Sequence, residues 1–136
     1  MSQIKRPTSV RKPGAVNRFE EIIAWQKGRA LAGAVYLASR SGSFARDYAF
    51  CSQIQKAAVS VMANIAEGAE RLHSKEFHQF LSVAKASCAE VRSHLYLALD
   101  IGYIDPTTFE RLMAQADETA RVIGGLRASI ARRLTG

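Results

Sequence analysis

The chain has 136 residues, of which 48% are hydrophobic and 23% are charged, and its formal net charge is +7. This length is typical of one domain that buries a sizeable core. No apolar run approaches the roughly 20 residues that cross a bilayer, and no apolar stretch follows the N-terminal positive charges, so the sequence predicts neither a membrane span nor a secretory signal. The cysteines, Cys51 and Cys88, lie among apolar neighbours, which favours buried, reduced thiols in a cytoplasmic protein.

The positive charge is concentrated at the start of the chain. Residues 1–18 contain five of the 19 Lys and Arg residues and no acid, which leaves 14 basic against 12 acidic side chains in the rest. Pro7, Pro13 and Gly14 interrupt any regular period, so we predict a flexible basic leader. Such a leader binds polyanions by releasing their counterions, but the same composition also fits a solvated segment that keeps the protein in solution. The charged residues of the leader are Lys5, Arg6, Arg11, Lys12 and Arg18.

The rest of the chain, 19–136, predicts one all-α domain. Apolar residues recur with a helical period over four segments joined by short links, and no segment alternates with the period of two that marks a strand. Short links make consecutive helices antiparallel neighbours, which predicts an up-down-up-down four-helix bundle. The expected helices span about 19–40, 46–67, 75–101 and 106–132.

The first predicted helix combines an apolar period with two glycines. Trp25, Val35 and Tyr36 are among the residues that keep the helical period. Gly28 and Gly33 each cost about 1 kcal/mol relative to Ala in a helix interior. Their presence therefore predicts that another helix approaches closely there.

Local signals support the third and fourth helices. The apolar positions of the third helix are spaced alternately four and three residues apart over three heptads, which predicts a seam for packing at shallow angles. Asp105 and Pro106 mark the start of the fourth helix, as N-cap and first helical residue. Gly124 and Gly125 predict a kink, a close helix crossing or early fraying. The seam consists of Phe77, Leu81, Ala84, Cys88, Val91, Leu95 and Ala98.

The stretch 51–68, CSQIQKAAVSVMANIAEG, carries only two charged residues. One face, with Ile54, Val61 and Ile65, fits the subunit core, and a second face of small apolar residues fits a neighbouring helix or subunit. A third face is polar, and we interpret it as a buried hydrogen-bonded network that fixes helix register or subunit contacts, with a recognition surface as the alternative. Gly68 suits the C′ position that ends a helix. The small face comprises Val59, Ala63 and Ala66, and the polar face comprises Gln53, Ser60, Asn64 and Glu67.

No motif in the sequence specifies a reaction. The di-iron pattern of helical bundles needs two Glu-x-x-His pairs, and the chain has one, Glu70 and His73, in a predicted link. Glu90 and His94 form an i, i+4 pair that fits a weak surface contact. Neither cysteine has a histidine at helical spacing, and the sequence contains no P-loop, dinucleotide-binding or G-x-S-x-G motif. We therefore expect a protein that is not an enzyme and that holds no metal and no cofactor.

The body of the chain also carries a set of residues found together in a known family. They are Trp25-Gln26-Lys27, Ser52-Gln53-Ile54, Ala57-Ala58-Val59-Ser60, Asn64-Ile65-Ala66-Glu67-Gly68, Glu76-Phe77, Phe80-Leu81, Ala84, Ser87, Glu90, Leu95 and Gly102-Tyr103-Ile104. Over about residues 19–130 the chain resembles the four-helix-bundle proteins known as 23S rRNA intervening-sequence, or S23-type, proteins. Within the resemblance, the polar face of 51–68 and Gly68 are a structural signature.

The resemblance implies a four-helix subunit that assembles into a homopentameric ring. It also implies a connection with RNA, because relatives are encoded within insertions of ribosomal RNA genes. Relatives of similar shape, the accessory proteins of diversity-generating retroelements, are basic pentameric barrels that act beside a reverse transcriptase and nucleic acid. The family has no established catalytic residues to carry over, and the leader lies outside the matched region.

Our first hypothesis is a homo-oligomeric scaffold without enzymatic activity. It binds RNA or DNA through its basic surface and leader, by phosphate contacts that do not read base sequence. The alternative is a protein–protein interaction module whose partner is unknown and which has no direct role with nucleic acid. Neither hypothesis involves a membrane. The phosphate contacts outside the leader are expected from Arg121, Arg127, Arg132 and Arg133.

Overall fold

The computed structural model describes residues 18–135, which form six helices and no strand. Four helices are long, and two short helices precede the first and second of them. The all-α prediction is confirmed, but the sequence places residues 41–45 in a link, whereas residues 42–46 form a short helix. The long helices are α1 (Ile23–Ser39), α3 (Tyr48–Ala69), α4 (Ser74–Asp100) and α5 (Pro106–Thr135), and the short ones are η1 (Phe19–Glu21) and α2 (Gly42–Arg46).

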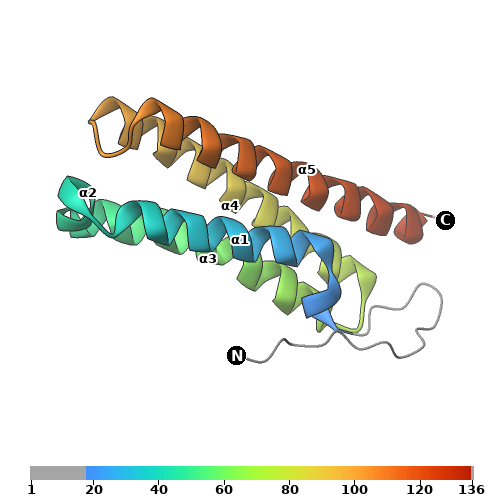
Figure 1. The fold of residues 1–136 in the computed structure, drawn as a ribbon. Helices are drawn as coiled ribbons and strands as arrows, with labels where there is room; N and C mark the ends of the chain where they lie inside the picture. The colour runs from blue at the N-terminus through green and yellow to red at the C-terminus, as the bar shows by residue number, and fades with distance from the viewer. Residues whose placement is uncertain (1–17, 136) are drawn as a thin grey trace, which may run out of the picture.

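The four long helices lie side by side as a bundle, and consecutive long helices run in opposite directions (Figure 1). α1 packs against α3 and α5, and α4 packs against the same two helices. This is the antiparallel arrangement that short links predict. Among the helices of residues 18–135, none combines the length and apolar character needed to cross a bilayer.

The core lies between the long helices and is filled by aliphatic and small side chains. All seven residues of the α4 seam are buried, from Phe77 to Ala98. On α3, Ile54, Val61 and Ile65 are buried, as the helical period predicts. Burial of a large aliphatic side chain stabilises the fold by about 1.5–3 kcal/mol. The spacing of these residues therefore decides which face of each helix points inward.

Two glycines let α3 approach its neighbours closely. A Cβ atom on Gly28 would lie 3.2 Å from Val61 Cγ1, so α1 and α3 pack tightly at this point, as predicted. A Cβ atom on Gly68 would lie 2.7 Å from Phe80 Cβ and 2.9 Å from Phe77 Cδ1. The prediction that Gly68 ends the helix as a C′ residue is wrong, because Gly68 lies inside α3 without a positive φ. Its missing side chain instead makes room for α4.

Other glycines have different surroundings. A Cβ atom on Gly33 would meet nothing within 4 Å, so the predicted close approach does not occur there. α5 continues through Gly124 and Gly125 to Thr135, which excludes early fraying. Gly102 has φ +80° and follows the end of α4, where left-handed backbone favours glycine.

The predicted cap at the start of α5 is present. Asp105 Oδ1 accepts a hydrogen bond from Thr108 N at 2.7 Å, and Pro106 is the first helical residue. α3 begins in the same way, because Asp47 Oδ1 accepts from Phe50 N at 3.1 Å. Caps of this kind contribute about 1 kcal/mol each.

Candidate functional site

The two ends of the bundle are formed by different elements (Figure 1). At the first, here called the leader end, η1 begins, α3 is followed by α4, and α5 finishes. At the second, the tyrosine end, α2 joins α1 to α3, and α4 is followed by α5. The leader end therefore contains Arg18 together with Arg132 and Arg133 of the last turn of α5. The other predicted phosphate contacts of the leader lie outside the described residues, namely Lys5, Arg6, Arg11 and Lys12.

The four predicted arginines of α5 differ in what they contact. Arg121, Arg132 and Arg133 are exposed, and none of them pairs with a carboxylate in residues 18–135. Arg127 donates from Nε to Ser82 Oγ at 2.7 Å, so α4 fixes its guanidinium group. Three of the four side chains are therefore available for an anionic partner.

A shallow groove of about 340 Å³ lies between α4 and α5. Lys85, Arg92 and Arg127 border this groove. Arg92 Nε lies 3.3 Å from Asp117 Oδ1, which offsets one of the three positive charges. Of these three cations, only Arg127 was predicted from the sequence to contact phosphate, because Lys85 and Arg92 stand on a different helix and are separated from it in sequence. Ala86, Ala89 and Ala120 also line the groove.

The polar face of α3 divides into an internal and an exposed part. Asn64 Nδ2 donates to the Ser60 carbonyl oxygen at 2.8 Å and to Ser60 Oγ at 2.9 Å. Ser60 Oγ shares a 2.8 Å hydrogen bond with Ser87 Oγ, which joins α3 to α4. Gln53 and Glu67 are exposed, so the prediction of one buried row is wrong for these two residues. The longer side chains of Gln53 and Glu67 extend beyond the contact between helices to water, whereas Ser60 and Asn64 stay within the contact between α3 and α4.

An aromatic cluster closes the tyrosine end. The Phe44 ring of α2 stacks on Tyr103 with centroids 5.1 Å apart and on Phe50 at 5.6 Å. Tyr103 OH donates to Asp47 Oδ2 at 2.7 Å, and this hydrogen bond, with that from Phe50 N, lowers the pKa of Asp47. His94 packs edge-on against Phe50 at 5.7 Å with only 18% of its side chain exposed, so its predicted surface position is wrong. The cluster ties the α4–α5 link to α2.

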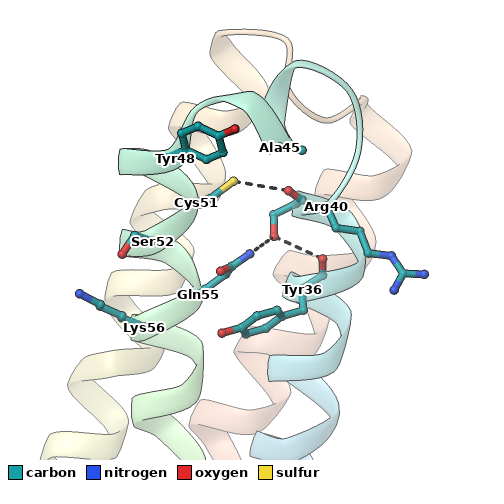
Figure 2. A pocket seen from close by; sticks show the side chains of 9 residues that line it. Tyr36, Arg40, Ala45, Tyr48, Cys51, Ser52, Gln55 and Lys56 are labelled. Carbon is teal, nitrogen blue, oxygen red and sulfur yellow. Dashed lines mark hydrogen bonds between the residues drawn. The ribbon is translucent and has the colours of Figure 1, made fainter.

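Beside this cluster, α1, α2 and α3 border a hollow of about 380 Å³ (Figure 2). Tyr36 of α1 and Tyr48 of α3 lie on its walls and are 45% and 81% exposed. Gln55 Nε2 donates to Ser39 Oγ at 2.9 Å, a hydrogen bond that connects α3 to α1 (Figure 2). None of the nine lining residues is acidic. The two cationic residues of the lining are Arg40 and Lys56.

The thiol in this hollow is unsuited to nucleophilic attack. Cys51 Sγ donates to the carbonyl oxygen of Phe44 at 2.9 Å and lies 3.4 Å from that of Ser39. Burial raises the pKa of the Cys51 thiol, and the negative charge of Asp47 raises it further. Burial in the core raises the pKa of Cys88 to about 11. With these raised pKa values, both thiols are protonated at neutral pH. They are unreactive there because the thiolate is the reactive form.

The described part of the chain holds no arrangement of three His, Cys, Asp or Glu side chains that would bind a metal ion. Glu70 and His73 lie between α3 and α4, in the link where the sequence places them. Glu90 Oε2 lies 3.5 Å from His94 Nε2, which is a single weak contact within α4.

The fold and its surfaces define an all-α protein of four long helices, with free positive charge at the leader end and an aromatic hollow at the tyrosine end. The chain belongs to the 23S rRNA-intervening sequence protein family, whose model matches residues 20–125. The resemblance seen in the sequence is therefore confirmed.

One solved structure similar to this chain is a protein of unknown function from the S23 ribosomal protein family of Bacteroides thetaiotaomicron. The two structures agree with a TM-score of 0.72 at 20% sequence identity, over 78% of this chain and 96% of that chain. At this level of identity the likeness supports the fold. A comparison with curated proteins gives no match.

Proposed function

We propose that this protein is a homo-oligomeric scaffold, without enzymatic activity, that binds RNA or DNA through its phosphates. The observation that carries the proposal is the unbalanced charge in the second half of α5. Residues 119–135 contain four arginines and no acidic residue. Arg121, Arg132 and Arg133 have no carboxylate partner in residues 18–135. Unpaired guanidinium groups suit phosphate oxygens, which they bind by charge-assisted hydrogen bonds.

The position of Arg18, the last residue of the predicted leader and the first described residue, supports the same proposal. Arg18 precedes η1 at the end of the bundle where the last turn of α5 carries Arg132 and Arg133 (Figure 1). One polyanion can therefore contact Arg18 and the end of α5 together. Contacts to phosphate fix a protein on nucleic acid but carry no base information, so we expect binding without sequence readout.

Exposed apolar side chains support the oligomeric part of the proposal. Val59 and Ala63 of the small face of α3 are exposed in the single chain. On α1, Ile23 and Leu37 are 56% and 59% exposed. Apolar residues left outside a bundle core are typical of a surface that another subunit covers. Light scattering of the purified protein measures the assembly mass, and a monomeric mass would contradict a ring of five, which is the expectation from the family resemblance.

The shifted titratable groups support a protein without catalysis. The pKa of Asp47 is lowered by its hydrogen bond from the Tyr103 hydroxyl and by the backbone hydrogen bond that begins α3. The pKa of Asp105 is lowered by the backbone hydrogen bond that begins α5. The pKa of Tyr103 is raised by its hydrogen bond to Asp47. These groups have structural partners, and the two thiols are protonated.

Fluorescence anisotropy with a labelled generic RNA tests the proposal. We expect the full chain to bind at about 50 mM salt and to weaken steeply by about 200 mM, because binding releases counterions. Deletion of residues 1–18 and the double change Arg132→Gln with Arg133→Gln should each weaken binding. Arg71→Gln is the matched control, since Arg71 already pairs with Glu67 at 2.9 Å. No binding by the full chain at the lower salt concentration would contradict the proposal.

The exposed apolar residues also fit the alternative, a protein-interaction module. Apolar contacts are not screened by salt, so a protein partner should remain bound after nuclease treatment and in high salt. Loss of every partner on nuclease treatment would count against this alternative.

A further inference from the structure

We propose that the hollow at the tyrosine end is a stacking site for unpaired bases of single-stranded nucleic acid, with Tyr36 and Tyr48 as the stacking surfaces. The inference rests on the proposed function and adds a contact of a different chemical kind. It concerns the end of the bundle opposite to the last turn of α5, which carries Arg132 and Arg133 (Figure 1). A strand bound there would place its bases on the aromatic rings.

The two tyrosines of the hollow differ from the other tyrosines of the described chain. Tyr103 stacks on Phe44 and donates to a carboxylate, and the Tyr96 ring lies 5.2 Å from that of Phe109. Tyr36 and Tyr48 have no ring partner and no side-chain hydrogen bond within residues 18–135, although both are ordered on long helices. Their flat faces are therefore open to a ligand with a π-face.

The charge of the hollow selects an anionic ligand. Arg40 and Lys56 belong to its lining, and their charged groups project on opposite sides of it (Figure 2). Neither forms an ion pair with a carboxylate of residues 18–135, and the lining contains no acidic residue. Aromatic surfaces flanked by cations are the combination that binds single strands, where bases stack and phosphates pair with positive charge.

The side chains between the tyrosines are held in place by hydrogen bonds. Ser39 Oγ donates to the Val35 carbonyl oxygen at 2.8 Å. It also accepts from Gln55 Nε2 at 2.9 Å (Figure 2). The Gln55 side chain is therefore fixed, and its amide oxygen has no donor within residues 18–135. This oxygen can accept a hydrogen bond from the exocyclic amine of adenine, cytosine or guanine. Uracil and thymine lack that amine, so they should bind less well.

The test compares two labelled oligomers of about eight nucleotides, within the site size of single-strand-binding proteins. One is an adenine oligomer and the other is an abasic oligomer with the same number of phosphates. Anisotropy with the full-length protein measures the affinity of each at one salt concentration. We expect the adenine oligomer to bind about five-fold or more tightly than the abasic one, the lower part of the range for base stacking.

Variants assign this difference to the hollow. Tyr36→Ala and Tyr48→Ala should each reduce the adenine preference, and the double change should remove it. Tyr36→Phe and Tyr48→Phe should keep it, since the ring remains. Tyr96→Ala is the matched control, because Tyr96 is 55% exposed and lies outside the hollow. Gln55→Leu should reduce the preference for adenine over uracil oligomers.

The outcomes separate this inference from the proposed function. If both oligomers bind equally well, the stacking site is wrong while phosphate binding stands. If neither binds, the proposed function fails and this inference fails with it. Competition by adenosine monophosphate as strong as by the oligomer would assign the hollow to a free nucleotide and overturn the assignment to a strand. A change of assembly mass in Tyr48→Ala with unchanged affinity would make the hollow a protein contact and overturn it too.

Discussion

The two ends of the bundle reverse the chain in different ways. At the leader end, the link between α3 and α4 is polar and open, and its Leu72 is 94% exposed. At the tyrosine end, Phe44 is 1% exposed and packs against Tyr103 of the other link. The same four helices thus carry one end where Arg132 and Arg133 have no carboxylate partner within residues 18–135 and one end that is fixed by aromatic packing. A fixed end can hold a shaped hollow, whereas an open end suits contacts to a flexible polyanion.

The largest expected effect comes from removing the centre of the aromatic cluster. Phe44→Ala should lower the free energy of unfolding by about 3–5 kcal/mol, the cost of truncating a buried Phe. Leu72→Ala, in the open link, should change it by about 0.5 kcal/mol or less. Urea unfolding followed by circular dichroism measures both. Equal effects of the two changes would contradict the contrast between the ends.

The leader end depends on a close helix approach rather than on a packed link. Gly68→Ala should destabilise the protein by about 1–3 kcal/mol, because the new methyl group overlaps Phe80 Cβ at 2.7 Å. Gly33→Ala is the matched control, since nothing lies within 4 Å of its Cβ position, and it should stabilise α1 by about 0.5–1 kcal/mol. Stabilisation by both changes would show that α3 and α4 are not in close contact at Gly68.

A smaller loss of stability is expected when the hydrogen bond from Tyr103 to Asp47 is removed. This bond joins the two links of the tyrosine end. The Tyr103 hydroxyl lowers the folded-state pKa of Asp47 from its ordinary value of 3.8, so this bond stabilises the folded state above that pH. The contribution is lost as pH falls from 3.8 through the lower folded-state pKa. Tyr103→Phe should therefore lower Tm at neutral pH, and the difference from the unaltered protein should shrink below pH 3.8. A difference that stays constant into acid would mean that the bond does not form in solution.

The sequence predicted the long helices well and the tyrosine end poorly. The α4 seam from Phe77 to Ala98 is regular over three heptads, and the Asp105 cap is a local signal, so neither needs knowledge of distant residues. α2 has only five residues, too few to show a period. Its Phe44 acquires a role only when the chain has turned back and brought Tyr103 beside it.

The candidate sites were also predicted only where they depend on local sequence. The positive charge of the second half of α5 is visible in the sequence itself, so this basic segment was predicted from composition. The helical period assigned Tyr36 to the apolar positions, but it lies at the edge of that face and is 45% exposed. Tyr48 lies in the same hollow as Tyr36 only because the chain turns at α2 between α1 and α3. No spacing in the sequence indicates that the two tyrosines lie in one hollow. Ser87 likewise completes the Ser60 and Asn64 network from another helix.

The two ends are proposed to contribute different kinds of binding energy, and the salt dependence of RNA binding distinguishes them. The slope of log affinity against log salt counts the phosphates that the protein neutralises, at about 0.7 per contact for a single strand. Arg132→Gln with Arg133→Gln should make this slope shallower. Tyr36→Ala with Tyr48→Ala should lower the affinity at every salt concentration and leave the slope unchanged. Equal slopes for all three proteins, or a shallower slope only in the tyrosine variant, would contradict the claim.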